Sequence, residues 1–159
     1  MTFRRRRRAL VSILALALSG CATTAVPGTT PTATPKGFLE LAISETCTEG
    51  SDPQCILIGD DYVMRPATFE DAPVANAAAS EGQEQEAVDI TLTAEGAAVL
   101  HDLTGQAAQA RGESRLLFKA GGEIIGSTVV MEALQGDHIT IALPSEHTAR
   151  EVLDLIRGT

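Results

Sequence analysis

Two spacings of apolar residues alternate along the last two thirds of this chain. Apolar residues at every second position are typical of a strand with one buried face, and apolar residues at every third or fourth position are typical of an amphipathic helix. The first spacing, together with one short apolar run, predicts strands at Phe38–Ser44, Cys55–Ile58, Ala87–Leu92, Arg115–Lys119, Glu123–Val130 and His138–Leu143. The second spacing predicts a helix capped by Thr93 and a last helix that is capped by Ser145 and ends at Arg157 and Gly158. Two prolines make Tyr62–Ala79 an expected irregular segment.

These elements are expected to form one domain. From Ala87 onward their order is strand, helix, strand, strand, strand, helix, which fits an antiparallel sheet covered by helices. Residues 37–159 number 123, enough for a domain with its own hydrophobic core. The sequence therefore predicts an α+β fold, with an antiparallel-rich sheet and two helices packed on one face, preceded by a disulfide-closed loop.

The first twenty residues have the pattern of an export signal. Arg4–Arg8 is a basic run, and Ala9–Leu18 is an apolar block of ten residues. A membrane-spanning helix needs about 20 apolar residues, so this block is too short for a permanent span. A basic region, a short apolar region and small residues before a cut are typical of a secretory signal peptide. Residues 1–20 are predicted to be that peptide, and the basic run fits either the general route or the twin-arginine route.

The signal ends in a more specific motif. Leu18-Ser19-Gly20-Cys21 resembles the lipobox of bacterial lipoproteins. The resemblance implies cleavage before Cys21, a diacylglycerol on its sulfur, and acylation of the new amino terminus, typically with palmitate. Two or more acyl chains anchor a protein stably. We therefore expect an exported protein, lipid-anchored to the cell envelope on the periplasmic face. In Gram-negative bacteria, an aspartate directly after the lipidated cysteine marks a lipoprotein for retention in the inner membrane. Ala22 takes that position here, so the outer membrane is favoured in such a host. The alternative is an ordinary signal peptide with an incidental cysteine.

Residues 21–36 are predicted to form the lipidated cysteine and a tether. After Cys21 the segment contains six threonines, three prolines and no large apolar residue beyond Val26. Such a composition cannot bury enough surface to offset the entropy lost on ordering. Regularly spaced prolines favour an extended polyproline-II chain, which reaches about 45 Å over fifteen residues.

The charge of the chain narrows its partners. The net charge is −9, but five of the twelve basic residues lie in the signal peptide, so the mature chain carries −14. Such a charge disfavours nucleic acid and anionic lipid surfaces as partners, apart from the acyl anchor. An acidic surface also keeps an exported protein soluble, which is the interpretation we prefer. Nothing in the composition implies a small-molecule substrate.

Two further cysteines fit the same compartment. Cys47 and Cys55 flank seven residues of polar, turn-forming character. In an oxidising compartment such a pair forms a disulfide, and closing this loop would stabilise the fold by roughly 2–3 kcal/mol in the chain-entropy description. A redox pair and a pair of metal ligands are the alternatives. The spacing is not C-x-x-C and no histidine is near, so a structural disulfide is favoured.

The sequence offers no catalytic constellation. His101, His138 and His147 have no serine or cysteine nucleophile beside them in a recognisable motif, and Asp102 diverges from His101 by roughly 100° around a helix. Zinc spacing, a calcium loop and a glycine-rich phosphate cradle are all missing from the sequence. We therefore predict no enzyme activity, no catalytic residue, no cofactor and no metal.

The domain resembles a known family in three segments. They are Asp89–Thr104 (DITLTAEGAAVLHDLT), Gly121–Leu134 (GGEIIGSTVVMEAL) and Ile139–Gly158 (ITIALPSEHTAREVLDLIRG), with a fainter match over Asp60–Ala75. They are similar to the head subdomain of the first periplasmic domain of SecD, or SecDF, the proton-driven partner of the SecYEG export channel. The family has six membrane helices that this chain lacks, and Gly126-Ser127-Thr128 replaces the usual small-small-proline turn. Proton-driven translocation by this chain alone is therefore not expected.

The resemblance implies a binding module. In the family the head is thought to hold polypeptide that emerges from the channel. The candidate polypeptide-binding residues are Leu116, Phe118, Ile124, Ile125, Val129 and Val130. An open strand edge would serve equally well, because a peptide can satisfy its unpaired backbone groups. The same residues alternate as a core face does, so a purely structural role is the alternative.

Two functional hypotheses follow. The first is a membrane-anchored lipoprotein whose SecD-like head binds unfolded polypeptide and is accessory to protein export. The second is a lipoprotein that uses the same fold to dock one folded envelope partner from an assembly or transport complex. An apolar groove or an open strand edge favours the first hypothesis, whereas a flat polar patch favours the second.

Overall fold

The computed structural model describes residues 36–80, 85–110 and 112–158. The predicted signal peptide, Cys21 and the tether up to residue 35 lie outside these residues. The elements are β1 (Gly37–Glu45), β2 (Cys55–Ile58), β3 (Asp61–Met64), β4 (Glu70–Ala79), β5 (Ala87–Leu92), α1 (Ala94–Gln109), β6 (Ser114–Ala120), β7 (Glu123–Val129), β8 (His138–Ala142) and α2 (Ala149–Arg157). In these described ranges, no helix has both the length and the apolar character to cross a membrane.

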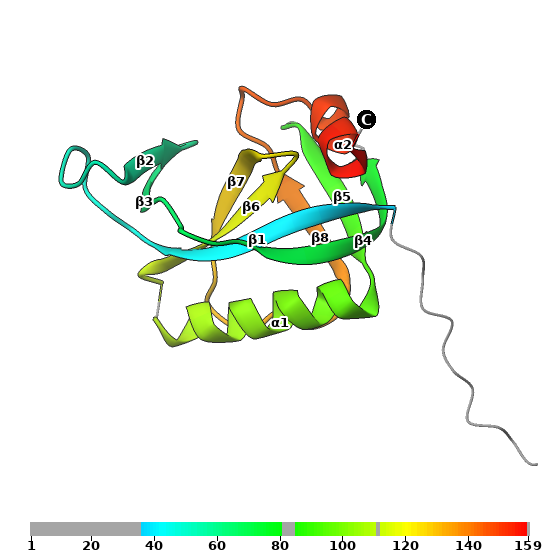
Figure 1. Cartoon of the computed structure of the whole chain (residues 1–159), viewed down its shortest axis with the longest axis horizontal. Coiled ribbons are helices and arrows are strands. Elements are labelled where there is room, and N and C mark those ends of the chain that lie inside the picture. The colour runs from blue at the N-terminus through cyan, green and yellow to red at the C-terminus, as the bar shows by residue number, and fades with distance from the viewer. Residues whose placement is uncertain (1–35, 81–84, 111, 159) are drawn as a thin grey trace, which may run out of the picture. The chain divides into compact units, whose positions relative to one another are not determined.

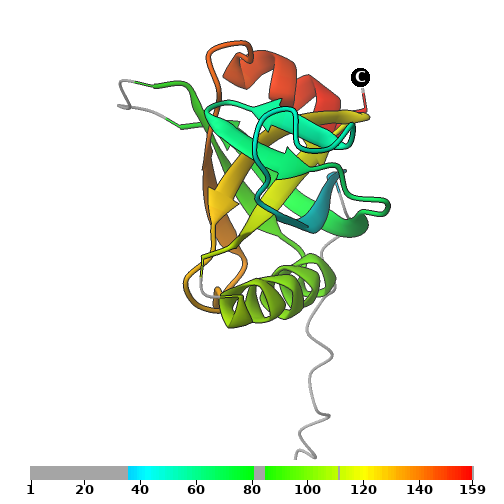
Figure 2. The same cartoon turned by 90° about the vertical axis from the view of Figure 1, so that its left-hand side faces the viewer.

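Six strands form one curled antiparallel sheet. Their order is β7-β6-β1-β4-β5-β8, and each neighbouring pair runs antiparallel. The sheet curls until it is nearly closed, with β7 and β8 as its two end strands (Figures 1 and 2). The predicted α+β class, the antiparallel sheet and the two helices are confirmed, but the near closure of the sheet was not predicted.

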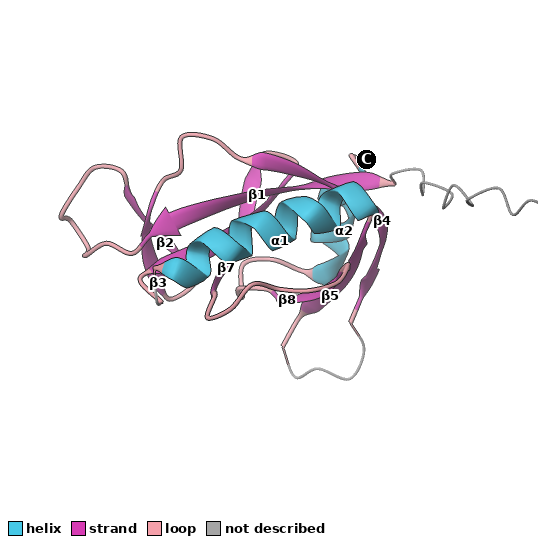
Figure 3. Cartoon of the chain, turned by 90° about the horizontal axis from the view of Figure 1, so that it is seen from below, coloured by secondary structure: helices cyan, strands magenta, loops and turns pink. Residues whose placement is uncertain are grey.

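The main core lies on the inner face of the curl. Alternate residues of the strands point inward, which is the reason for the period-two pattern in the sequence. Fully buried inner-face residues include Leu39, Leu41, Val74, Val88, Ile90, Leu116 and Ile125. Both helices add residues to this same cluster. They lie at opposite ends of the sheet (Figures 1 and 2), and α1 runs across the end that faces the viewer in Figure 3.

The helix starts show where sequence reasoning succeeds and where it fails. Thr93 caps α1 as predicted, because its hydroxyl accepts a hydrogen bond from the Gly96 amide at 3.2 Å. The prediction of Ser145 as the cap of α2 was wrong. Thr148 is the cap, since its hydroxyl and the Glu151 carboxylate form a reciprocal capping box. Gly158 ends α2 in the left-handed conformation.

The expectation of an irregular segment over Tyr62–Ala79 was also wrong, because it contains β3 and β4. Pro73 lies within β4 although it has no amide hydrogen. Its carbonyl accepts the Thr93 amide at 2.9 Å, and the Thr93 carbonyl, which would face the missing hydrogen, accepts the Ala97 amide instead. The proline is tolerated because the neighbouring chain leaves the sheet at that point to begin α1.

A small second layer covers the outer face of the sheet. The β2–β3 hairpin places Ile58 and Val63 against Leu117, which points outward from β6. The Cys47–Cys55 disulfide closes the loop that leads into this hairpin, with 6.0 Å between the Cα atoms. The predicted disulfide is confirmed, but its loop lies between β1 and β2 rather than before the sheet.

The packing of α1 on β4 makes two glycines of one helix respond oppositely to alanine. A methyl group on Gly96 would lie 2.5 Å from the Pro73 carbonyl oxygen, whereas one on Gly105 would meet only Ala133 at 3.8 Å. We expect Gly96→Ala to destabilise the fold by about 1–3 kcal/mol, because backbone must move. Gly105→Ala should stabilise it by about 0.5–1 kcal/mol through helix propensity. Urea unfolding of both variants tests this, and equal shifts would contradict the described helix packing.

Candidate functional site

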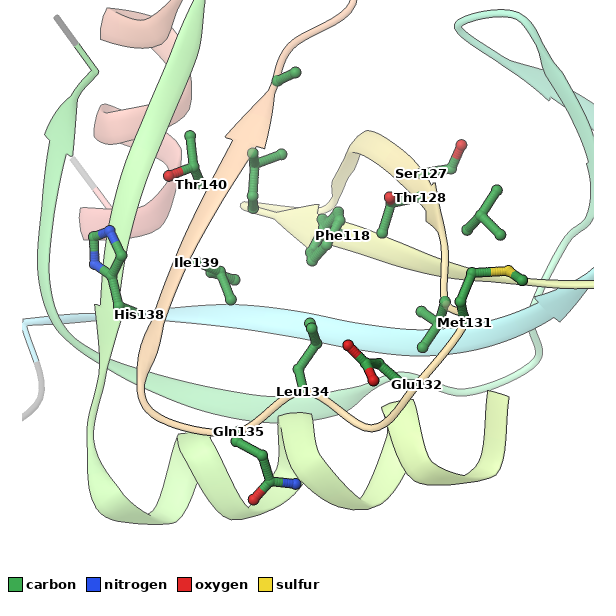
Figure 4. Close-up of a pocket in the computed structure, with 14 residues that line it drawn as sticks. Phe118, Ser127, Thr128, Met131, Glu132, Leu134, Gln135, His138, Ile139 and Thr140 are labelled. Carbon is green, nitrogen blue, oxygen red and sulfur yellow. The ribbon is translucent and has the colours of Figure 1, made fainter. Parts of the chain in front are cut away.

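A cleft with a mainly apolar lining lies between the two end strands of the sheet. It has a volume of about 520 Å³ and is lined by Phe118, residues 127–132, Leu134, Gln135 and residues 138–142. These residues come from β6, β7, β8 and the loop that joins β7 to β8 (Figure 4). Figure 4 shows Phe118, Leu134 and Ile139 converging on the space between the strands. The cleft is therefore an opening into the apolar interior of the curled sheet.

Exposed apolar side chains gather at the mouth of this cleft. Among the described residues, the exposed large hydrophobic side chains are Phe38, Leu57, Val129, Met131 and Leu134. The last three all line the cleft, and Met131 is the most exposed, at 72%. Apolar groups that stay in water side by side are typical of a binding surface rather than of a solvated loop.

The two strands approach each other closely at Gly126. A methyl group placed there would lie 3.6 Å from Ile141 Cγ2 and 3.7 Å from the Ala142 carbonyl oxygen. The cleft lies beyond this point, between Ser127–Val129 and the first residues of β8. No strand in the described part of the chain pairs with the outward edge of either β7 or β8.

The register shows which backbone groups of β8 face the cleft. The Leu92 amide donates to the Asp137 carbonyl, and the Leu143 amide donates to the Glu86 carbonyl. In an antiparallel pair the residues that face the neighbouring strand alternate. The odd-numbered residues of β8 therefore bond to β5, and the amides and carbonyls of His138, Thr140 and Ala142 point toward the cleft.

The register of β6 shows in the same way which backbone groups of β7 face the cleft. The Thr46 amide donates to the Glu113 carbonyl, so the odd-numbered residues of β6 face β1 and the even-numbered residues face β7. Leu116 and Phe118 are opposite Thr128 and Gly126. Ser127 and Val129 therefore direct their amides and carbonyls into the cleft. The cleft is lined on both sides by unpaired backbone.

The loop between β7 and β8 is held in place by α1. The Leu134 amide donates to Thr104 Oγ1 at 2.9 Å, and Thr104 Oγ1, which is fully buried, donates to the Leu100 carbonyl at 2.7 Å. His101 Nδ1 lies 3.1 Å from the Leu134 carbonyl and 3.0 Å from Gln135 Nε2, and the ring tautomer decides which bond forms. These bonds fix the position of Leu134 beside the cleft.

An ion pair on the outer face of the sheet anchors β7, which forms one wall of the cleft. Arg115 Nε lies 3.2 Å from Asp61 Oδ2, and the Ser127 hydroxyl donates to the same oxygen at 3.1 Å. The hydrogen bond from Arg115 is the largest cause that holds the pKa of Asp61 below its ordinary value, and the bond from Ser127 adds to it against partial burial. Asp61 thus ties the β3 hairpin to β7 beside the cleft.

The cleft wall formed by β8 is tied to β5 in a similar way. Thr140 Oγ1 donates to Asp89 Oδ1 at 2.6 Å, and this bond is the largest cause of a lowered Asp89 pKa. The hydroxyl of Thr140 is therefore occupied, while its backbone still faces the cleft.

The six candidate polypeptide-binding residues are divided among three places. Phe118, Val129 and Val130 line the cleft. Leu116 and Ile125 are completely buried in the main core, and Ile124 packs against the outer cluster of Ile58, Val63 and Leu117. Sequence reasoning missed Met131, Glu132, Leu134, Ile139 and Ile141, which also line the cleft. The one local signal in the sequence was the pair of apolar residues Met131 and Leu134 in the segment that directly follows a strand.

The histidines do not come together in a site. His101 lies at the loop contact described above, His138 begins β8, and His147 precedes α2. Among residues 36–80, 85–110 and 112–158, no group of three or more His, Cys, Asp and Glu side chains could hold a metal ion.

Comparisons with protein-family models, with curated proteins and with solved structures found no match.

The Asp61 anchor predicts a pH dependence of stability. Because its folded-state pKa is depressed, the stabilisation is complete above the unfolded carboxyl's pKa of about 4 and is lost as the pH falls through the folded-state pKa. We expect Asp61→Asn to cost about 0.5–1 kcal/mol at pH 7, as for a partly exposed ion pair, and less at pH 3. Urea unfolding at both pH values measures this. Asp60→Asn, at the exposed neighbour, is the control, and equal losses in both variants would contradict the anchor.

Proposed function

We propose that this protein is a non-catalytic, membrane-anchored envelope lipoprotein that binds extended polypeptide in the cleft between β7 and β8. The observation that carries the proposal is the combination of two unpaired strand edges with three exposed apolar side chains at one opening. Backbone groups at a free edge can bond to any extended chain, whatever its sequence. Apolar side chains at the mouth add affinity for the unfolded state, because folded proteins bury such groups.

The resemblance to the SecD head supports the same function. The segments that carry it include β7 with the residues that follow it up to Leu134, and most of β8, which line the cleft. We propose that the domain is a SecD-like head without the membrane-embedded motor, and that it is accessory to protein export. The lipid on Cys21 and the tether would hold it on the periplasmic face of the outer membrane.

The alternative of one folded partner differs in the shape of the surface it needs. A folded partner is recognised through a broad patch of roughly 800 Å² on each side. The cleft instead has a volume of about 520 Å³, a mainly apolar lining and unpaired strand backbone on both sides, which suits a single extended segment. An extended polypeptide is therefore the better supported ligand.

Photocrosslinking in cells tests this function. A crosslinking amino acid at Val129 or Met131 should yield many products of different mass, because unrelated extended chains would pass through the cleft. Leu57 is the matched control site, since it is 56% exposed but lies on β2, away from the cleft.

The outcomes separate the hypotheses. Heterogeneous products at the cleft sites and few at Leu57 support polypeptide binding. A single sharp product at both Val129 and Met131 would support one folded partner and refute the proposed function. Products that are equally abundant at all three sites would also refute it, because they would reflect surface exposure alone.

A further inference from the structure

We infer that the polypeptide bound by this protein is a short basic segment with alternating apolar side chains, and that it is added as a strand to the edge of β8. The inference rests on the proposed function and specifies its ligand. The ligand is expected to pair with β8 rather than with β7, and to carry positive rather than negative charge.

The edge of β7 is poorly suited to receive a strand. A bulge at Ile125 interrupts its pairing with β6 next to Gly126, where the cleft narrows, and bulges twist a strand edge away from regular pairing, so β7 offers only a short regular edge. Its cleft-facing backbone is limited to Ser127 and Val129.

The edge of β8 has no such bulge. Its five residues pair with β5 in unbroken register, and none of them is proline or lysine, the residues that usually protect an edge. His138 and Thr140 both offer an amide and a carbonyl to the cleft. Ala142 faces Gly126 at the narrow end, so it is the point where an added strand must stop.

The depth of the cleft accounts for the apolar part of the ligand. Every second side chain of a strand added to β8 would point toward the inner face, where Phe118, Leu134 and Ile139 converge (Figure 4). The room between the Gly126 contact and the joining loop limits this pairing to a few residues, so one or two apolar side chains can enter.

The charge of the cleft accounts for the basic part. Glu132 is exposed and is the one carboxylate among the lining residues, and no lysine or arginine lines the cleft. Asp137 precedes β8 and is also exposed. With a mature net charge of −14, the surrounding field attracts cations over a longer range. A basic residue that alternates with the apolar ones would point outward into this negative field.

Two synthetic peptides test the inference with the purified full chain. One is a labelled peptide of alternating valine and lysine, and the other is its counterpart with glutamate in place of lysine. Fluorescence anisotropy should show binding of the lysine peptide and at least tenfold weaker binding of the glutamate peptide. Glu132→Gln should weaken the lysine peptide about threefold, as expected for one exposed ion pair. Equal binding of the two peptides would overturn the charge selectivity.

The choice of edge is tested with proline. His138→Pro removes an amide hydrogen that faces the cleft at the first residue of an edge strand, a position where proline is tolerated. It should abolish binding, whereas His138→Ala, which keeps the amide, should not. On β7, Val129→Pro should weaken binding no more than Val129→Ala does, because both variants lose the valine side chain and only the proline also removes the amide hydrogen that faces the cleft. Thermal unfolding of each variant verifies the fold.

N-methylation of alternate amides of the lysine peptide makes the complementary test and leaves the protein unchanged. One of the two methylation patterns should abolish binding and the other should not. If Val129→Pro abolishes binding, Val129→Ala does not, and His138→Pro leaves binding intact, the chosen edge is wrong while the proposed function stands. If both methylated peptides bind as well as the parent, strand addition is wrong. If neither peptide binds and cells give no crosslinks from Val129 or Met131, the proposed function fails as well.

Discussion

The cleft exists because the six-stranded sheet curls almost into a closed barrel without pairing its two end strands. A closed barrel has no free edges, whereas this sheet leaves two facing each other. The strands approach at Gly126 and Ala142 and leave space toward the loop that joins them. The opening exposes unpaired backbone, and it gives the apolar core contact with the surface. Both properties of the proposed binding site follow from the missing hydrogen-bond ladder between β7 and β8.

The rest of the domain holds the opening in shape. Helix α1 fixes the joining loop through the buried hydroxyl of Thr104, which explains a threonine in the middle of a helix. The outer hairpin supports β7 through Asp61, and the disulfide closes the loop that leads into that hairpin. Contacts far apart in the sequence therefore converge on the two walls. A rigid open edge suits binding better than a mobile one, because less entropy is lost when a ligand is ordered.

Local patterns predicted much of the fold and little of the site. Alternating apolar residues identified most strands, and Thr93 and Gly158 identified helix ends, because those signals act within a few residues. Pro73 misled the prediction, since its tolerance in β4 depends on Thr93, which lies twenty residues later. Alternation could not separate Leu116, which is core, from Phe118, which lines the cleft. Whether a strand is an edge depends on which strands lie beside it, and no local pattern encodes that.

Residue-resolved hydrogen exchange of the free protein tests the open edge most directly. The amides of His138 and Thr140 should exchange quickly, because they face the cleft without a partner, while those of Ile139 and Ile141 should be slow because they bond to β5. Alternating fast and slow amides along one strand would show an unpaired edge. Uniformly slow exchange along β8 would mean that the sheet closes through β7 in solution, and the account of this cleft would be wrong.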